Sequence, residues 1–182
     1  KKLIILRMDK MWTKRGFMNI DYQNGILLPS FFRTMDENQS VFAGEFSNNF
    51  FLLVTLDKNQ LIYPVWKTHR NLFPAGITLG RGLVNDICIP SEAISKIHAY
   101  FRQVNNEWII IDHYSIRGTW IENYKVSAAQ NNVVADQAKL KFGSLEASFL
   151  SFASLLKLKD RTECLPVSIG PEYSRAWLAA QK

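Results

Sequence analysis

Three side chains in the middle of the chain are of the types used in nucleophilic catalysis. Ser95, His98 and Asp112 supply a hydroxyl, an imidazole and a carboxylate, the groups of a serine-type triad. No Gly-x-Ser-x-Gly turn surrounds Ser95 to expose it as a nucleophile. Because residue types alone are weak evidence for such a set, we expect no catalytic residue and no enzyme activity.

The sequence indicates neither a metal site nor a cofactor site. Its histidines and cysteines show none of the spacings of zinc ligands. The run Leu79-Gly80-Arg81-Gly82 has two glycines but lacks the Gly-Lys-Ser/Thr ending of a phosphate-binding loop. We therefore expect no bound metal and no cofactor.

Arg81 offers a different chemistry, the binding of an anion. A guanidinium group presents a fixed fork of N–H donors that matches phosphate oxygens, and it stays charged at any physiological pH. The net charge of +6 also attracts anions, but it does not choose among nucleic acid, lipid headgroups and phosphorylated peptides. The chain shows no block of like charges, no basic–aromatic alternation of the kind that stacks bases, and no apolar run of membrane-spanning length. We expect neither nucleic acid nor a membrane as the partner.

Short runs of β-branched and aromatic residues surround these side chains. We predict strands over Phe50–Leu56, Leu61–Trp66, Ile77–Leu79, Asp86–Ile89, His98–Val104, Trp108–Asp112, Thr119–Ile121, Val133–Val134, Lys139–Phe142 and Ala147–Phe152. Turn clusters such as Asp57-Lys58-Asn59 and Asn105-Asn106 separate them. Many short strands at this spacing indicate an all-β sandwich or barrel.

The two ends of the chain differ from this middle part. We expect residues 1–47 to form a partly helical N-terminal extension, residues 48–153 the β domain, and residues 154–182 a C-terminal extension with a short helix at Leu155–Lys159. In the N-terminal extension one helical face carries Phe31, Met35, Phe42 and Phe46. Such a stripe usually packs on the core, although it could dock a partner helix. Near the C-terminus, Pro171 opens another predicted helix with Tyr173 and Trp177 on one face.

Four sequence blocks follow one another between Thr78 and Asn123. They read Leu79-Gly80-Arg81, Asn85-Asp86-Ile87, Ile94-Ser95-Lys96-Ile97-His98-Ala99 and Ser115-Ile116-Arg117-Gly118-Thr119. In this order and spacing the chain resembles the forkhead-associated (FHA) domain, a module that binds phosphothreonine peptides. The resemblance extends from about Leu53 to Phe152. It implies an FHA-type β-sandwich of short, mainly antiparallel strands, with the helical extensions at both ends.

The resemblance also implies roles for individual residues. Phosphopeptide binding falls to Arg81, Ser95, Lys96 and Arg117. Arg81 would hold the phosphate and Ser95 would add a hydroxyl donor, while Lys96 would touch the phosphate or the peptide. Support of the binding loops falls to Gly80, His98, Gly118 and Thr119. The histidine would brace the loops rather than contact the ligand.

Arg117 departs from the family pattern, which has Ser-x-Asn-Gly-Thr at this place. An asparagine amide offers the peptide backbone both a donor and an acceptor, whereas an arginine offers donors only. Ile116 beside it cannot form a hydrogen bond through its side chain. Either Arg117 adds a cation to the phosphate site, or the departure marks altered peptide alignment.

We therefore expect a non-catalytic, phosphothreonine-peptide-binding adaptor in signalling. Its partner would be a phosphorylated protein, a kinase substrate or a kinase, and its compartment the cytoplasm. The alternative is a degenerate FHA fold that acts as a phosphate-independent interaction or scaffold module. Loss of binding on dephosphorylation of the partner would distinguish the first from the second.

Overall fold

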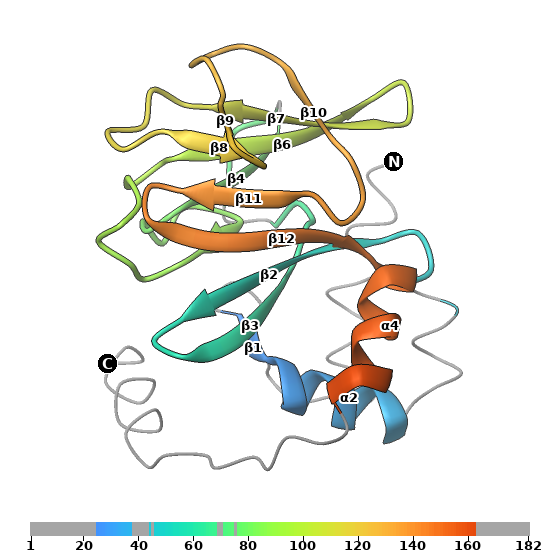
Figure 1. Ribbon diagram of the computed structural model, residues 1–182. Coiled ribbons are helices and arrows are strands. Elements are labelled where there is room, and N and C mark those ends of the chain that lie inside the picture. Colours follow the sequence, from blue (N-terminus) through green and yellow to red (C-terminus); the bar gives the residue numbers. More distant parts are fainter. Residues whose placement is uncertain (1–24, 38–43, 45, 69–70, 75, 163–182) are drawn as a thin grey trace.

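Two β-sheets and a pair of helices make up the part of the chain that a computed structural model describes, residues 25–37, 44, 46–68, 71–74 and 76–162. The sheets stack face to face, and the helices cover part of the outer face of the larger sheet (Figure 1). Nearly all neighbouring strands are antiparallel. The predicted all-β sandwich is confirmed.

The larger sheet has seven strands. Their spatial order is β1 (Ile26–Leu27), β3 (Asn59–Pro64), β2 (Phe50–Leu56), β12 (Leu145–Ser151), β11 (Lys139–Phe142), β8 (Thr119–Ile121) and β9 (Tyr124–Lys125). The sequence did not predict β1 and β9, which are only two residues long and too short to show an alternating pattern.

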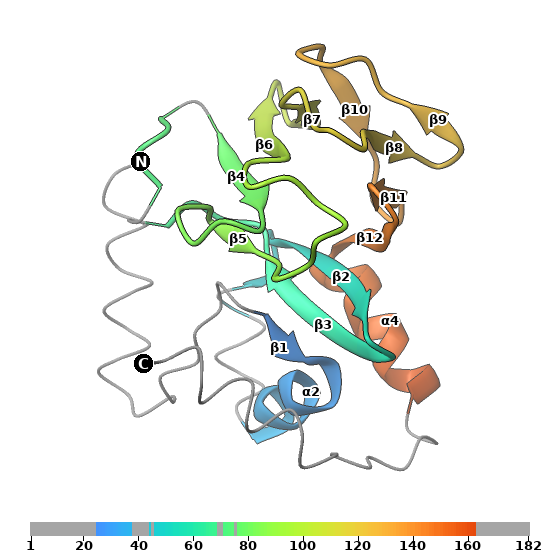
Figure 2. The same ribbon diagram turned by 90° about the vertical axis from the view of Figure 1, so that its left-hand side faces the viewer.

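The smaller sheet has five strands. Their order is β10 (Asn132–Val134), β7 (Glu107–Asp112), β6 (Ala99–Val104), β4 (Ile77–Gly80) and β5 (Ile87–Cys88). Within this sheet β4 and β5 are parallel, and the two lie beside each other at its edge (Figure 2). Because parallel strands end on the same side, the loops that follow β4 and β5 meet at one end of the sandwich.

Two tight hairpins confirm the turn predictions. The backbone φ angles of Asp57 and Lys58 are 49° and 68° between β2 and β3, and those of Asn105 and Asn106 are 49° and 66° between β6 and β7. A two-residue turn with both angles positive matches the natural twist of the strands it joins. These turns fix the register of both hairpins.

Alternation along β2 divides its side chains between two apolar clusters. Leu52 and Val54 point into the core between the sheets, while Phe51 faces the opposite side and packs under the helices. The helices are α2 (Leu28–Glu37) and α4 (Phe152–Thr162). The ring of Phe31 on α2 lies edge-on to Phe51 at 5.6 Å between centroids. The apolar stripe of the N-terminal segment therefore packs on the sheet, with Phe31, Met35 and Phe46 all buried; Phe42 lies outside the described residues.

The helix predicted at Leu155–Lys159 begins earlier and is longer than expected. The Ser151 hydroxyl accepts a hydrogen bond from the Ser154 backbone N–H at 3.2 Å, which caps the first turn. The Asp136 carboxylate in turn accepts the Ser151 N–H at 2.7 Å and the Ser154 hydroxyl at 2.7 Å. Burial alone would raise the pKa of Asp136, but these hydrogen bonds outweigh it and hold the pKa below its ordinary value. A partner far away in sequence thus sets the start of α4.

The termini are described only in part. The segment with Tyr173 and Trp177 lies outside the described residues. Of the helices in the described ranges, neither has the length and apolar character needed to cross a membrane.

Candidate functional site

Three loops at one end of the sandwich carry all the side chains predicted to bind phosphate. Arg81 follows β4, Ser95 and Lys96 lie between β5 and β6, and Arg117 lies between β7 and β8. In each case the side chain stands on a segment that connects strands of the sandwich core. The sheets therefore set the positions from which the loops project.

Backbone hydrogen bonds join the first two loops. The Arg81 N–H donates to the Ser95 carbonyl at 3.0 Å, and the Gly82 N–H donates to the Lys96 carbonyl at 3.0 Å. Gly80 permits this close approach, since a Cβ atom there would lie 2.3 Å from the Lys96 carbonyl oxygen. Its role is thus close packing between backbones rather than a turn.

Asn85 fastens the same two loops through its side chain. The amide nitrogen donates to the Gly82 carbonyl at 2.6 Å and to the Lys96 carbonyl at 2.7 Å. Asn85 is buried with 1% of its surface exposed, so these bonds form away from competing water. The first bond closes a local turn over residues 82–85, and the second reaches across to the loop of Lys96.

His98 joins the second loop to the third. Its Nδ1 accepts the Ser95 backbone N–H at 3.0 Å, so the proton is on Nε2, which donates to the Gly118 carbonyl at 3.1 Å. The side chain is fully buried. Burial lowers the pKa of His98, against the opposing effects of the Gly118 carbonyl and Asp112. A neutral imidazole with both nitrogens bonded to backbone groups is a brace, and no serine hydroxyl is activated by it.

Asp112 organises the third loop, a role that sequence reasoning missed. Its carboxylate accepts the Ser115 N–H at 2.9 Å, the Ser115 hydroxyl at 2.6 Å and the buried Thr119 hydroxyl at 2.6 Å. The available signal was an aspartate at a strand end with a serine three residues later, a pattern that favours a side-chain-closed turn. Gly118 completes the loop with a φ of +78°, and its carbonyl also accepts the Gly143 N–H at 2.9 Å.

The Ser95 hydroxyl lies between the second and third loops. Its oxygen accepts the Ile116 backbone N–H at 3.1 Å. The hydroxyl proton is therefore directed elsewhere and can be donated to a ligand. The bond also places Ser95 next to the backbone of Ile116, which directly precedes Arg117.

Asn85, His98 and Asp112 form a buried frame under the three loops. The cationic side chains on these loops reach solvent. Lys96 and Arg117 are exposed, and Arg81 is partly covered, with 35% of its side chain accessible. Glu92 lies near Arg81, with Oε1 3.8 Å from Nη1. The sequence gave no reason to single out this carboxylate, which belongs to the same loop as Ser95. Exposed cations and a hydroxyl donor thus stand on three loops that hydrogen bonds join together, and groups of these types can bind an anion.

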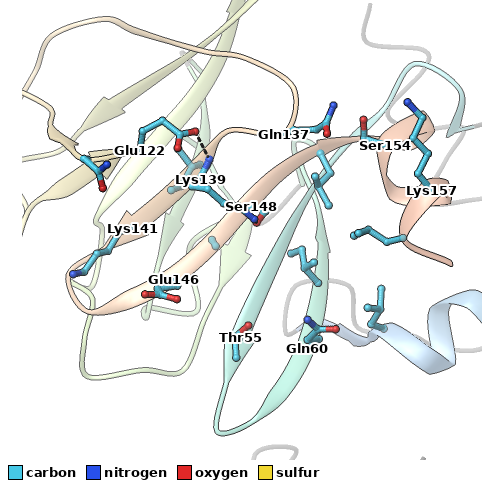
Figure 3. A pocket seen from close by; sticks show the side chains of 17 residues that line it. Thr55, Gln60, Glu122, Gln137, Lys139, Lys141, Glu146, Ser148, Ser154 and Lys157 are labelled. Atoms are coloured by element: carbon cyan, nitrogen blue, oxygen red, sulfur yellow. Dashed lines mark hydrogen bonds between the residues drawn. The ribbon is translucent and has the colours of Figure 1, made fainter. Parts of the chain in front are cut away.

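A groove lies on the outer face of the larger sheet, away from the three loops. This groove of about 750 Å³ has lysines and carboxylates on its walls, among them Lys139, Lys141, Lys157, Glu122 and Glu146 (Figure 3). The Glu122 carboxylate accepts the Lys139 backbone N–H at 2.8 Å. Charges of both signs line this groove, so it does not favour an anion as a surface of cations alone would. Neither here nor elsewhere in the described ranges do three His, Cys, Asp or Glu side chains gather as metal ligands would.

Comparisons with known proteins agree with the sequence blocks. The family model of the FHA domain matches residues 77–143, which contain all four blocks and all three loops. Among solved structures, a domain from a structural and functional analysis of phosphothreonine-dependent FHA interactions is 19% identical; the match covers 57% of this chain and 96% of that one, with a TM-score of 0.46. An FHA domain from Chlamydia trachomatis is 18% identical over 58% of this chain and 99% of its own, with a TM-score of 0.46.

A third solved structure is EmbR of Mycobacterium tuberculosis in complex with a low-affinity phosphopeptide. It is 20% identical, the match covers 68% of this chain and 31% of that one, and the TM-score is 0.47. No curated protein sequence is significantly similar to this chain.

Proposed function

Since residues 77–143 match the family model of the FHA domain, we propose that this chain binds a phosphothreonine segment of a partner protein through Arg81, Ser95, Lys96 and Arg117. The observation that carries the proposal is the pair of backbone bonds, Arg81 to Ser95 and Gly82 to Lys96. These bonds join the backbone of the loop that carries the Arg81 guanidinium to the loop that carries the Ser95 hydroxyl. An anion that enters between the loops would meet both groups.

The phosphate group would be held by charge-assisted hydrogen bonds. A phosphothreonine carries nearly two negative charges at neutral pH and three strong acceptor oxygens. Arg81 would donate to two of these oxygens and the Ser95 hydroxyl to one. Lys96 and Arg117, which are exposed, would add longer-range attraction. A hydrogen bond to a charged group is worth about 1.5–3 kcal/mol, so Arg81 would supply the largest share.

The buried frame prepares the site before the ligand arrives. His98, Asn85 and Asp112 are each buried to 97% or more, with exposed fractions of 0%, 1% and 3%. Their hydrogen bonds fix all three loops, so little loop entropy would be lost on binding. The Arg81–Glu92 contact is a surface pair of at most about 1 kcal/mol, which a dianion can displace.

The proposed activity is recognition without chemistry. The partner would be a protein phosphorylated on threonine, a kinase substrate or a kinase, and the chain would act as a signalling adaptor in the cytoplasm. Two of the solved structures described above were studied for such recognition, one in phosphothreonine-dependent interactions and one with a bound phosphopeptide. What those proteins bind supports the proposal for this chain only by analogy of fold family.

Calorimetric titration with a degenerate phosphothreonine peptide library tests the proposal. We expect binding of the phosphothreonine library and none of the matched threonine library. Phosphoserine peptides serve as a control for selectivity toward the threonine methyl group. Equal binding of phosphorylated and unphosphorylated peptides would contradict the proposed function.

The alternative function is phosphate-independent scaffolding. It is favoured by Ile116 and Arg117, which depart from the family pattern, and by the groove on the larger sheet (Figure 3). Phosphatase treatment of a captured partner distinguishes the two functions, because binding is lost if it depends on phosphothreonine and is kept if it does not. Strong, steeply salt-dependent binding to nucleic acid would contradict both.

A further inference from the structure

Large hydrophobic side chains are unusually exposed around the three loops. Ten are exposed in the described part of the chain, and five of them stand on these loops: Leu83, Val84, Ile97, Tyr114 and Ile116. Ile116 has 91% of its surface exposed and Leu83 has 70%, so both side chains project into solvent. Exposed apolar surface of this extent marks a site of interaction with a protein or a membrane.

The third loop holds its apolar side chains outward by hydrogen bonds. Tyr114 has a φ of 51°, a left-handed conformation that bulky residues rarely adopt. The Asp112 carboxylate closes the turn around it by accepting the Ser115 N–H at 2.9 Å, and the Ile116 N–H donates to the Ser95 hydroxyl at 3.1 Å. The fold thus keeps Tyr114 and Ile116 in solvent although both are large and apolar.

Cations continue from the loops along the adjoining strands of the larger sheet. Trp120 on β8 is paired with Lys125 on β9 and with Lys141 on β11, and each ammonium group lies 5.6 Å from the centre of the Trp120 ring. A Cβ atom at Gly118 would lie 2.6 Å from Lys125 Cε, so this lysine lies against the third loop. The cations of this end are Arg81, Lys96, Arg117, Lys125 and Lys141.

Two exposed carboxylates oppose these cations. Glu92 Oε1 lies 3.8 Å from Arg81 Nη1, and Glu146 is paired with Lys141 across β11 and β12. The cations remain in excess. A surface of anionic lipid attracts each lysine or arginine that stands close to it, so this end of the sandwich has the charge that such a surface requires.

We propose that the loop end docks on a bilayer that contains anionic phospholipid. The cations would lie at the headgroups, while Leu83, Val84 and Ile116 enter the interfacial layer between headgroups and acyl chains. Tyr114 and Trp120 suit this depth, because a ring with a polar tip favours the boundary between water and apolar surroundings. A protein partner would need a surface of complementary shape. A fluid bilayer needs none, so it better accepts side chains that project singly from three loops.

This docking differs from what we expected of the sequence, which was no membrane partner. That expectation depended on the absence of an apolar run long enough to span a bilayer. The exposed apolar residues stand on three separate loops, and only the fold gathers them at one end. Membrane docking needs no phosphopeptide, so it adds to the proposed function and does not depend on it.

Co-sedimentation with vesicles tests the proposal. We expect the wild-type chain to bind phosphatidylcholine vesicles that contain phosphatidylserine and to bind pure phosphatidylcholine vesicles far less, with binding that weakens as salt is added. Val84→Ser and Ile116→Ser should each weaken binding by about tenfold, the scale of one aliphatic side chain removed from an apolar environment. Lys125→Ala and Lys141→Ala should each weaken it by about fivefold.

Val104→Ser and Lys157→Ala are the matched controls and should bind as the wild type does. Val104 is a 39% exposed valine at the end of β6, and Lys157 is an exposed lysine on α4; both lie away from the three loops. Circular dichroism checks that each variant folds, and the lysine variants decide the matter if Val84→Ser or Ile116→Ser does not.

Failure of the wild type to bind phosphatidylserine vesicles, or equal losses in the test and control variants, would overturn the proposal. Self-association in sedimentation velocity that Val84→Ser abolishes, without binding to either kind of vesicle, would instead assign these side chains to an interface between copies of the chain. A phosphothreonine peptide that binds while neither kind of vesicle does would leave the proposed function intact and overturn membrane docking alone.

Discussion

Two surfaces of this molecule carry clustered cations, and they differ in what lies beneath. At the loop end, Arg81, Lys96 and Arg117 stand on segments joined by buried hydrogen bonds from Asn85 and His98. On the outer face of the larger sheet, lysines such as Lys139 and Lys141 project from strand β11 among glutamates (Figure 3).

The difference lies in preorganisation and charge balance rather than in the number of cations. The Lys139 ammonium donates to the Ser148 hydroxyl at 3.1 Å on an exposed surface, and Glu146 lies on the same face. Side chains of this kind are well solvated, and a carboxylate on the same face opposes an incoming anion, so an anion gains little there. At the loop end the cations stand on loops held by buried hydrogen bonds, which would favour the proposed binding of an anion in one fixed position.

Replacing Arg81 would break this comparison most severely. We expect Arg81→Ala to fold normally and to bind a phosphothreonine peptide at least about tenfold more weakly, since a charged hydrogen bond is worth about 1.5–3 kcal/mol. Lys139→Ala on the larger sheet removes the same charge and should leave affinity unchanged. Calorimetric titration measures both; equal affinities for the two variants would remove the distinction between the surfaces.

The buried frame is tested by His98. We expect His98→Ala to lower the free energy of unfolding by about 1–3 kcal/mol, because the Ser95 N–H and the Gly118 carbonyl lose their partner. Phosphopeptide affinity should fall with the resulting loop disorder. The exposed His113 provides the control, and His113→Ala should unfold at the wild-type urea concentration. A His98→Ala variant of normal stability that binds no peptide would show that the imidazole contacts the ligand.

Arg117 sharpens the comparison, since it is a cation at the position where the FHA motif that the sequence resembles has an asparagine. We expect Arg117→Asn to tighten phosphothreonine binding by about threefold to tenfold, because one amide regains an acceptor for the peptide backbone worth about 1 kcal/mol. The exposed charge of Arg117, which the substitution removes, contributes less than this to the affinity. Titration of one peptide against both proteins measures the change. Tighter binding by the wild type would assign Arg117 to the phosphate.

Acidification should weaken the frame and leave the other surface unaffected. Burial lowers the pKa of His98 below the ordinary value of 6.5, so between these two pKa values the unfolded chain binds the proton and the folded chain does not. Stability is therefore fully present above about pH 6.5 and declines as the pH falls toward the folded pKa. Urea unfolding at pH 7.5 and at pH 5.5 should show the decline, and His98→Asn should reduce it. If the free energy of unfolding of His98→Asn falls between pH 7.5 and pH 5.5 as much as that of the wild type, another group causes the pH dependence.

The smallest effect concerns Glu92. Its carboxylate lies 3.8 Å from the Arg81 guanidinium and is 89% exposed. We expect Glu92→Gln to raise phosphopeptide affinity by about twofold at low salt, because an exposed pair is worth no more than about 1 kcal/mol. The gain should vanish at high ionic strength. Weaker binding by Glu92→Gln would mean that the carboxylate helps to position Arg81.

Local patterns predicted most of the strands. The bounds of β2, β8 and β11 agree with the sequence prediction, and the turns at Asp57-Lys58 and Asn105-Asn106 followed from residues that adopt positive φ easily. The start of α4 could not be predicted in this way, since Asp136 supplies the contact that orders its first turn.

By itself the sequence determined the all-β class, the four FHA blocks and the identity of the exposed cations, because these depend on residue types at short spacing. Only the tertiary structure decided how the loops are tied together. Asn85 reaches Lys96, His98 reaches Gly118, and Ser95 reaches Ile116, each across a distance in sequence that no local pattern encodes. Asp86 likewise joins Thr68 to Thr78 of the smaller sheet through its carboxylate. A hydrogen bond between loops forms only after the sheets have stacked, so its partners become neighbours through the packing of the whole core.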